Sequence, residues 1–419
     1  MANEYLPRVV DSELKERLDA VATVVVEGPR ACGKTETARR HSASEVLLDI
    51  DENARRAAEV DPGLILAGDR PRLIDEWQTV PRLWNHVRRA SDTLGEPGQF
   101  ILTGSAVPPD DTTRHTGAGR ISRVRMRPMT LVESGYSTGA SSLGQLLRGE
   151  VVDVDHSTHS IEVIAALVAR GGWPGTLTLD LDPAIRFVRD YLDEIRRTDI
   201  VRVDGSRRDA DRVQRLFRSL ARNVATEAAI TTLASDTGGA DDPIHPATVS
   251  EYLGALERLF VVEDQPAWSP ALRSRSRLRS SAKRHFVDPS LAVAALRAAP
   301  DRLLTDLKLF GFLFESLVIR DLRVYGGHHD ASVYHYRDGT GLEIDAVVES
   351  AAGSWVGVEV KLGGDQHIED ASENLLTLAE RIHPELVGPP SALVVVTLGG
   401  YGYRRTDGVW VIPISTLGP

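Results

Sequence analysis

The chain has 419 residues, of which 42% are hydrophobic and 26% are charged, a composition typical of a folded globular protein. Its formal net charge of −11 argues against a general nucleic-acid coat protein, because such proteins draw most of their affinity from neutralising phosphates. No apolar run approaches the roughly 20 residues of a membrane span, and residues 1–10 lack a signal-peptide pattern, so we predict a cytoplasmic protein with no membrane partner. The single cysteine, Cys32, excludes an internal disulfide and a zinc site built from several cysteines.

A glycine-rich loop follows the first apolar run, residues 22–26. From Gly28 to Thr35 it reads Gly-Pro-Arg-Ala-Cys-Gly-Lys-Thr, the spacing of a phosphate loop between a strand and a helix. The two glycines let consecutive backbone N–H groups surround a phosphate, Lys34 reaches its outer oxygens, and the Thr35 hydroxyl ligates Mg²⁺. We expect ATP or ADP to bind through Gly28, Pro29, Arg30, Ala31, Cys32, Gly33, Lys34, Thr35 and Glu36.

A short apolar strand, residues 71–76, ends in two carboxylates. Asp75 would hold the Mg²⁺ through water, and Glu76 would polarise the water that attacks the terminal phosphate. Paired acids at a strand end are common on protein surfaces. Because this pair follows a phosphate loop in the same chain, we interpret it as catalytic.

The next apolar strand, residues 99–102, leads into Thr103, Gly104 and Ser105. A hydroxyl at this place would bond the terminal phosphate or the attacking water, although a turn needs the same residues for its own backbone bonds. Several arginines follow, and one that reached a neighbouring subunit's phosphate would stabilise the transition state. These arginines are Arg114, Arg120, Arg123, Arg125 and Arg127.

Together these motifs resemble a compact bacterial and archaeal branch of the AAA-type ATPases, over about the first 135 residues. The resemblance implies that Ser105 or Thr103 senses the phosphate and that Arg120 is an arginine finger. A finger acting in trans would require a homo-oligomer, although a monomer or dimer stays open. The matching segments are Gly28 to Thr35, Leu73 to Trp77, Leu102 to Ser105, Gly119 with Arg120, and Pro128 to Glu133.

The middle of the chain has a helical period. A helix at 246–260 followed by extended residues 259–263 and 267–268 suggests a winged-helix unit, a fold that often enters the DNA major groove. The polar side of this helix carries few groups suited to bases, so we favour a structural or partner-docking role over DNA binding. Further helices are expected at 161–170, 183–199 and 213–226.

A second constellation lies near the C-terminus. Glu315 lies in an amphipathic helix at 311–322, and Asp345 interrupts the apolar alternation of a strand at 342–348. On the next strand Glu359 and Lys361 are two residues apart, a spacing that sends both side chains to one face. Gathered together, these groups would form a site for a hard cation, Mg²⁺ or Mn²⁺, in which Lys361 orients a water or stabilises an oxyanion.

This second pattern resembles the restriction-endonuclease-like superfamily, in which an Asp precedes Glu-x-Lys across a hairpin and a helical Glu comes first. The resemblance implies metal ligands at Glu315, Asp345 and Glu359, with Glu359 and Lys361 catalytic. It extends through a helix at about 370–382 and a strand at 392–397. The alternative is an exposed strand whose Glu-x-Lys pair is a solvated face.

The charge of the C-terminal region opposes nuclease action. From Arg320 to Pro419 there are 14 acidic and 7 basic residues, a local charge of −7, whereas a DNA-cleaving surface is expected to be basic away from its metal. The stretch 265–287 has no acidic residue and could supply a basic groove, although a linker or an exposed strand edge explains it equally well. Its basic residues are Arg273, Arg275, Arg277, Arg279, Lys283 and Arg284.

We therefore predict an α/β protein of three domains. These are a P-loop AAA-type ATPase domain at 1–140, a helical and winged-helix domain at 141–285, and a restriction-endonuclease-like domain at 286–419. ATP binding and hydrolysis would gate the C-terminal domain's action on nucleic acid. The alternative is an ATP-dependent switch or assembly protein whose C-terminal domain is a catalytically silent docking module.

Overall fold

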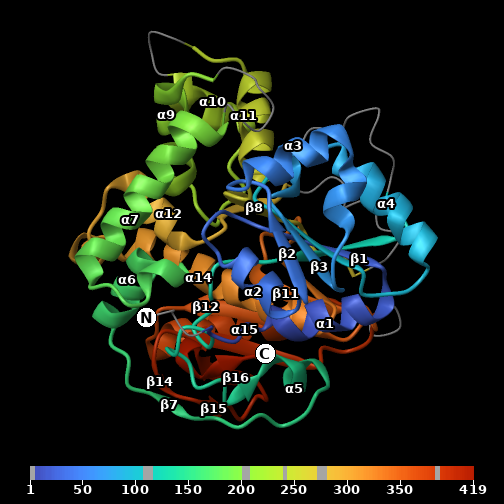
Figure 1. Cartoon of the computed structure of the whole chain (residues 1–419). Coiled ribbons are helices and arrows are strands. Elements are labelled where there is room, and N and C mark those ends of the chain that lie inside the picture. The colour runs from blue at the N-terminus through green and yellow to red at the C-terminus, as the bar shows by residue number, and fades with distance from the viewer. Residues whose placement is uncertain (1–4, 107–116, 201–207, 239–242, 271–280, 383–386) are drawn as a thin grey trace. The chain divides into compact units, whose positions relative to one another are not determined.

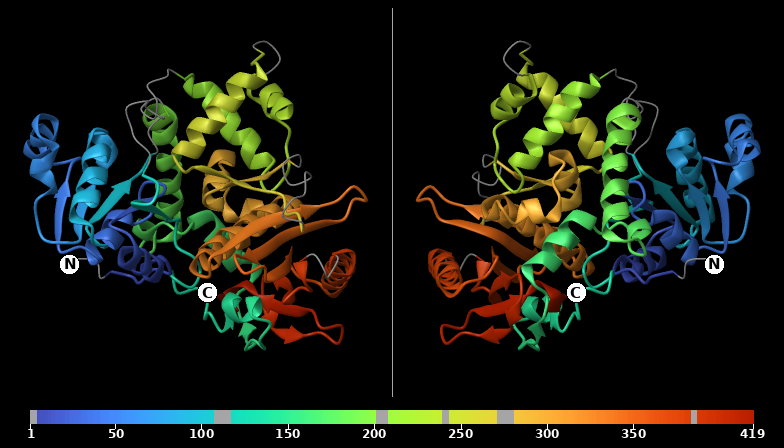
Figure 2. Two further views of the ribbon diagram at one scale, coloured as in Figure 1. Left: turned by 90° about the vertical axis from the view of Figure 1, so that its right-hand side faces the viewer. Right: turned by 90° about the vertical axis from the view of Figure 1, so that its left-hand side faces the viewer.

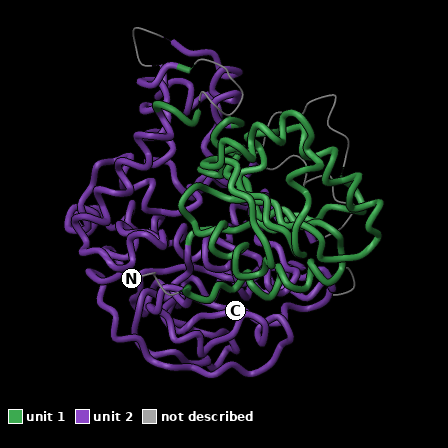
Figure 3. The backbone as a smooth tube through the Cα atoms, viewed as in Figure 1, with its two compact units in different colours: residues 1–128, 197–208, 254–261 green, residues 129–196, 209–253, 262–419 purple. Residues whose placement is uncertain are grey.

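The computed structural model describes residues 5–106, 117–200, 208–238, 243–270, 281–382 and 387–419 (Figure 1). The chain divides into two compact units, drawn in different colours in Figure 3. The first unit comprises residues 1–128, 197–208 and 254–261, and the second comprises residues 129–196, 209–253 and 262–419. Beside these two units, our division into three domains stays a prediction. None of the described helices is long and apolar enough to cross a membrane.

The first unit is built on a parallel sheet of five strands in the order β2-β3-β4-β1-β5. Strand β1 lies between β4 and β5, with Thr23 opposite both Phe100 and Ile121. Because all the strands run the same way, the loop after β1 emerges at the edge where β3 and β4 also end. The strands are β1 (Thr23–Glu27), β2 (Ser44–Leu47), β3 (Arg72–Asp75), β4 (Phe100–Gly104) and β5 (Ile121–Arg125).

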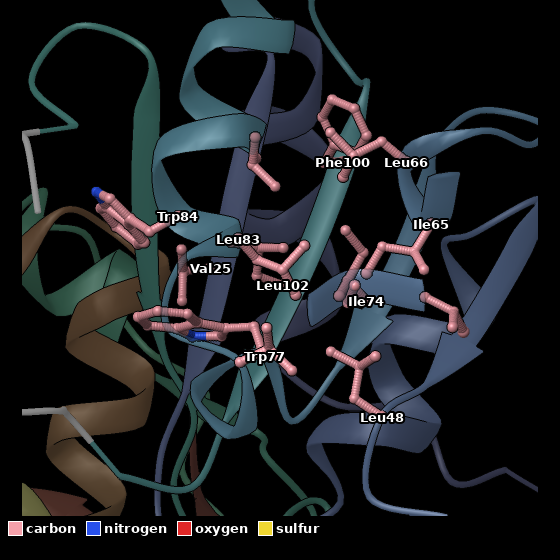
Figure 4. Close-up of a cluster of buried hydrophobic side chains, with 14 residues drawn as sticks. Val25, Leu48, Ile65, Leu66, Ile74, Trp77, Leu83, Trp84, Phe100 and Leu102 are labelled. Atoms are coloured by element: carbon pink, nitrogen blue, oxygen red, sulfur yellow. The ribbon is translucent and has the colours of Figure 1, made fainter. Parts of the chain in front are cut away.

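Helices cover both faces of this sheet, because successive strand side chains point to opposite sides. Val24 and Val26 pack in one apolar cluster with Leu14. Val25 packs in the other cluster, where Trp84 lies over the sheet (Figure 4). The result is a three-layer arrangement, in agreement with the predicted α/β class. The helical elements are α1 (Val10–Ala20), α2 (Lys34–Arg40), α3 (Glu52–Val60), α4 (Leu83–Leu94), η1 (Pro62–Leu66) and η2 (Trp77–Thr79).

The second unit contains a mixed sheet in the order β10-β11-β12-β13-β16-β15. Strands β10, β11 and β12 are antiparallel, and the first two form the orange hairpin of Figure 2. Strands β12, β13 and β16 are parallel, so β12 and β13 need a crossover, which α15 supplies. The elements are α14 (Leu307–His328), β10 (Ala331–Arg337), β11 (Glu343–Ser350), β12 (Trp355–Lys361), α15 (Asp365–Arg381), β13 (Ala392–Thr397), β15 (Tyr403–Arg404) and β16 (Trp410–Pro413).

Two short strand pairs join residues 141–157 to the end of the chain. β6 (Ser141–Ser142) pairs with β17 (Leu417–Gly418), and β7 (His156–Ser157) pairs with β14 (Gly400–Tyr401). These pairings hold residues 141–157, which our three-domain division assigns to the middle domain, beside strands that it assigns to the C-terminal domain.

Helices make up most of the rest of the second unit. Of the predicted winged-helix unit, the helix expected at 246–260 is α11, and the extended residues expected at 259–263 overlap β8, which pairs with β9. The winged-helix assignment and its role stay predictions. The division between the two units falls within α11 and within the π-helix η4 (Ile195–Asp199). The other elements are α5 (Leu143–Leu147), α6 (Ile161–Arg170), α7 (Leu181–Glu194), α9 (Ala210–Arg222), α10 (Ile230–Gly238), α11 (Pro246–Arg258), α12 (Pro289–Leu296), α13 (Pro300–Leu303), β8 (Val262–Gln265), β9 (Lys283–Phe286), η3 (Pro174–Thr176) and η6 (Ile414–Thr416).

A buried ion-pair network fixes α14 within the second unit. Arg320 lies 2.8 Å from Asp288 and 2.7 Å from Asp321, and all three side chains are buried. Backbone N–H groups also donate to these carboxylates: Gly172 donates over 3.0 Å to the Asp288 oxygen that Arg320 contacts, and Leu131 donates over 3.0 Å to Asp321 Oδ2. Buried charges need such partners, and these partners hold in place the helix that carries Glu315.

Candidate functional site

The phosphate loop joins β1 to α2 in a backbone conformation that its small residues permit. A Cβ atom at Gly28 would lie 2.1 Å from the carbonyl oxygen of Met126, so only glycine fits there. Gly33 has φ 101° and Ala31 has φ 58°, both in the left-handed region. A non-glycine residue in that region is uncommon and often marks a functional loop. Cys32 has a buried free thiol. Its backbone carbonyl accepts a 2.8 Å hydrogen bond from the Arg8 guanidinium, which helps to hold the loop in place.

Lys34 begins α2 and is held inside the loop. It is only 5% exposed, and its Nζ donates a 2.7 Å hydrogen bond to the carbonyl oxygen of Pro29. This bond folds the lysine back over the loop. The ammonium therefore lies where the loop N–H groups would surround a phosphate.

Asp75 lies at the end of β3, within reach of the loop. The Thr35 hydroxyl donates a 2.8 Å bond to Asp75 Oδ1, and Thr103 on β4 donates to the same oxygen. The Thr103 hydroxyl also accepts the backbone N–H of Glu76 over 3.2 Å. Burial raises the pKa of Asp75, and the two hydroxyl donors oppose that rise. The arrangement suits a carboxylate that shares a cation with Thr35.

Glu76 follows β3 in a left-handed conformation with φ 52°. The Ser105 hydroxyl donates a 3.0 Å bond to Glu76 Oε2, and the side-chain amide of Gln78 donates to the same oxygen. Ser105 and Glu76 both line the pocket described below, whereas Thr103 is fully buried. Of the two hydroxyls left open by the sequence, Ser105 is therefore the one that lines the pocket. Gln78 was missed by sequence reasoning, because a glutamine two residues after a strand carries no distinguishing pattern.

These side chains border one pocket of about 740 Å³ within the first unit, a volume typical of ligand sites. The pocket also contains Asp199 and Leu259, which lie far along the sequence from the loop. The side chain of Arg30 is 3.1 Å from Asp199, which is 4% exposed. No sequence motif marks Asp199, because only the folded chain brings it to the loop. The lining residues are Arg30, Ala31, Gly33, Lys34, Thr35, Glu36, Asp49, Arg55, Asp75, Glu76, Gln78, Thr79, Ser105, Ala106, Asp199 and Leu259.

The residues of this pocket fit ATP and Mg²⁺. The loop offers Lys34 to phosphates, and Thr35 and Asp75 offer oxygen ligands at adjacent positions. The predicted loop residues Gly28, Pro29 and Cys32 support the loop and are not among the described residues that line the pocket.

Arg120 lies away from this pocket. It precedes β5, whose first residue pairs with the start of β1, whereas the phosphate loop follows the end of β1. Its guanidinium is paired with Asp92 at 2.5 Å. An arginine at this end of the strand cannot reach the nucleotide site of its own chain. Its predicted role as a finger therefore requires a neighbouring subunit.

The second predicted cluster is brought together in the second unit. Lys361 Nζ lies 2.5 Å from Glu359 Oε2 and 3.5 Å from Asp345 Oδ2. The amide of Asn374 on α15 donates to Glu359 over 3.3 Å. The Nζ of Lys283 lies 2.8 Å from Glu315 Oε1. The sequence does not predict Lys283 at this site. The sequence groups Lys283 with the basic stretch 265–287, which could supply a groove, whereas its side chain is 7% exposed and ion-paired. Residues 271–280 of that stretch lie outside the described residues.

The carboxylates of this cluster differ in how easily they ionise. Burial raises the pKa of Glu315 to about 8, and it raises the pKa of Glu359 well above its ordinary value. For Asp345 burial acts in the same sense, but Lys361 and Lys283 outweigh it and lower the pKa to about 2. Asp345 is therefore the anionic centre, with an amine on each side.

The cluster does not fit a metal ion in the arrangement observed. Among the described residues, no group of three or more His, Cys, Asp or Glu side chains is placed to hold one. The physical reason is that ammonium groups contact Glu315, Asp345 and Glu359. The predicted three-carboxylate metal site is thus not preformed, and it stays a prediction.

Three parts of the chain match known protein families. Residues 21–134 match a family described as an AAA domain. Residues 161–302 and 310–417 match two domains of unknown function, DUF8612 and DUF4143 respectively. The first match covers β1, β3 and β4 with the loop and carboxylates that they carry.

Two mycobacterial proteins are similar over almost the whole chain. The uncharacterized proteins Rv2008c of Mycobacterium tuberculosis and Mb2031c of Mycobacterium bovis are each 26% identical over 412 residues, which cover 97% of this chain and 83% of theirs. A solved structure, the Walker-type ATPase PABY2304 of Pyrococcus abyssi, aligns with a TM-score of 0.44 at 15% identity, over 71% of this chain and 97% of its own. Residues 21–134 are thus similar to an AAA domain, and two segments that match domains of unknown function follow.

Proposed function

We propose that this protein is a Mg²⁺-dependent ATPase whose active site is the pocket of the first unit. The observation that supports it is the meeting of Lys34, Thr35, Asp75, Glu76 and Ser105 around one pocket. Mg²⁺ would neutralise charge on the phosphate oxygens, and Thr35 and Asp75 are the residues that would hold it.

The residues divide the work of hydrolysis by position. The loop N–H groups and Lys34 orient the phosphates, and Glu76 accepts a proton from the attacking water as the oxygen bonds to the terminal phosphorus. The bond to the bridging oxygen then breaks, which releases ADP and phosphate. Ser105 and Gln78 fix the Glu76 carboxylate, since both donate to the same oxygen.

Arg120 supports a homo-oligomeric form of the ATPase. Because it lies at the opposite end of β5 from the phosphate loop, it would act only on a nucleotide bound by a second copy. ATPase activity that rises with protein concentration and is lost in Arg120→Ala would support this arrangement. Activity of a dilute monomer equal to that of the concentrated protein would count against it.

A second candidate function concerns the C-terminal domain, which we infer to be nuclease-like and gated by ATP. Its support is the convergence of Glu315, Asp345, Glu359 and Lys361 on one site, as the resemblance implies. An antiparallel hairpin, a crossover helix and a parallel strand follow the helix that carries Glu315, which agrees with a restriction-endonuclease-like fold. The rival is a catalytically silent docking domain in an ATP-dependent switch.

One experiment separates these two roles of the C-terminal domain. Wild type and Lys361→Ala are incubated with DNA and RNA substrates in Mg²⁺ or Mn²⁺, with and without ATP. Cleavage by the wild type that is lost in Lys361→Ala supports the nuclease. No cleavage in any nucleotide state supports the silent docking domain.

A further inference from the structure

The ribbon of β8 and β9 places an amine among the carboxylates of the C-terminal cluster. Lys283 lies on β9, opposite Gln265 on β8. Its Nζ is 2.8 Å from Glu315 Oε1 and 3.6 Å from Asp345 Oδ1. Glu315 and Lys283 are 6% and 7% exposed, so water does little to screen the pair.

Asp345 is held between two amines. One carboxylate oxygen faces Lys283, and the other faces Lys361 at 3.5 Å and accepts the backbone N–H of Val360 over 2.8 Å. The position bounded by Glu315 and Asp345 is thus occupied by the ammonium of Lys283. A cation ligated by these two carboxylates would have to take that same position.

Lys283 is fixed there by the strands that carry it. The side-chain amide of Gln265 donates to the carbonyl oxygens of Asp345 and Tyr334, over 2.9 and 3.0 Å. His285 bonds Gln265 through one ring nitrogen and Ser316 through the other, at 2.9 and 2.8 Å. These bonds tie the ribbon to β11 and α14, the elements that carry Asp345 and Glu315.

The formal charges agree with an ammonium group in the place of a metal ion. The three carboxylates carry three negative charges when ionised, and Lys361 offsets one of them, which leaves the charge that one divalent ion would balance. With Lys283 also present, only one negative charge is left even when all three carboxylates are ionised, so the attraction for a divalent ion is weaker. Adding the ion beside the ammonium would place two cations at the same carboxylates, a repulsive arrangement.

We propose that Lys283 is the resident cation of this acidic site and that a divalent metal binds only when Lys283 is displaced. The inference rests on the proposed metal-binding role of Glu315, Asp345 and Glu359. It adds that the site is closed by the chain's own ribbon, which the sequence pattern of the three acids and Lys361 does not reveal.

The test measures Mn²⁺ binding to the full chain. Two methods read the binding: calorimetry and the Mn²⁺ electron paramagnetic resonance signal. All proteins carry Lys34→Ala and are kept free of nucleotide. Lys283→Met should bind Mn²⁺ at least about tenfold more tightly than the parent, because a competing cation is removed. Adding Asp345→Asn should abolish the gain. Lys308→Met, at an exposed lysine of α14, is the matched control and should bind as the parent does.

The outcomes separate the inference from the proposed function. Equal Mn²⁺ binding by the parent and Lys283→Met, lost on Asp345→Asn, would overturn the role of Lys283 and leave the metal site standing. No binding by any variant would overturn both the metal site and the role of Lys283.

A measurement on the unaltered protein guards against a folding defect in Lys283→Met. Amine-reactive labelling read by mass spectrometry should modify Lys308 readily and spare Lys283, and added Mn²⁺ should increase labelling at Lys283. Equal labelling of the two lysines without metal, or labelling of Lys283 that Mn²⁺ leaves unchanged, would overturn the proposal.

Discussion

The hydroxyl of Thr35 and a carboxylate oxygen of Asp75 lie 2.8 Å apart, although 40 residues separate them in the sequence. The parallel sheet produces this contact, because the loop after β1 and the end of β3 emerge at the same edge. The two oxygen atoms that we propose as Mg²⁺ ligands are thereby placed together at the helix turn that carries Lys34.

Replacing Lys34 by Ala should weaken nucleotide binding. The lysine is the buried cation of the loop, and its Nζ already points inward at the Pro29 carbonyl. We expect the dissociation constant for ATP to rise by about tenfold or more, since each tenfold corresponds to roughly 1.4 kcal/mol. Titration with a fluorescent ATP analogue measures it. Lys15→Ala, at an exposed lysine of α1, should bind like the wild type, and equal binding by Lys34→Ala would contradict the assignment.

Ser105→Ala and Thr103→Val should separate turnover from stability. Ser105 bonds the Glu76 carboxylate at the pocket, so its loss should lower the rate of hydrolysis and leave ATP affinity near that of the wild type. Thr103 is buried and bonds Asp75, so its loss should lower the free energy of unfolding by about 1–3 kcal/mol. Steady-state kinetics and urea unfolding provide the two readouts. An unchanged rate in Ser105→Ala would remove Ser105 from the site.

Asp199 and Arg30 should affect ATP affinity in opposite directions. Asp199 puts a carboxylate into a pocket proposed to hold phosphates, and Arg30, 3.1 Å away, partly offsets it. Asp199→Asn should tighten ATP binding about two- to fivefold, the range of a modest charge interaction. Arg30→Ala should weaken binding by a similar factor. If Asp199→Asn weakens binding instead, the carboxylate makes a favourable contact with the nucleotide.

Acid should destabilise the second unit through its buried histidines. Burial lowers the pKa of His335 to about 4, and nearby Lys283 acts in the same sense. The pKa of His285 is also lowered by burial. The unfolded chain binds these protons first, so the stabilising contribution is complete above pH 6.5, the ordinary pKa, and is lost as the pH falls through about 4. The loss should reach about 1.4 kcal/mol per pH unit for each histidine.

Urea unfolding of wild type and His335→Gln between pH 7.5 and 4.5 measures this dependence. Glutamine keeps a donor for the Ser281 carbonyl, to which His335 Nε2 donates over 3.0 Å. The free energy of unfolding of His335→Gln should fall less steeply with decreasing pH than that of the wild type. His367→Gln, at an exposed histidine of α15, should follow the wild type. Parallel curves for wild type and His335→Gln would show that His335 does not titrate in this range.

Local patterns predicted the elements and the acidic ends of strands well. The helix expected at 161–170 and the strand expected at 392–397 have those bounds in the structure. The sequence predicts that Asp345 and Glu359 lie close together, and both contact Lys361 because alternation on β11 and β12 fixes which way each side chain points. Glu315 reaches the same cluster from α14, through Lys283. Periodicity and motif spacing are local properties, so they can be identified in the sequence before the fold is known.

Contacts that depend on tertiary structure could not be predicted from the sequence. Lys283 reads as one of six basic residues in an acid-free stretch, yet the ribbon buries it against Glu315. Asp199 is the last residue of η4 and has no motif around it, so only the folded chain brings it to the pocket. Arg120 was identified by resemblance alone, and strand direction places it at the far end of β5.

The central claim is that Glu76 activates water in an ATPase site, and Glu76→Gln tests it most directly. ATP binding and ATP turnover are measured on the same preparations of wild type, Glu76→Gln and Glu59→Gln, the last at an exposed glutamate of α3. Glu76→Gln should bind ATP within about twofold of the wild type and hydrolyse it about 100-fold more slowly or worse, the usual contribution of a general base. Glu59→Gln should match the wild type in both. Hydrolysis by Glu76→Gln at the wild-type rate would contradict the account.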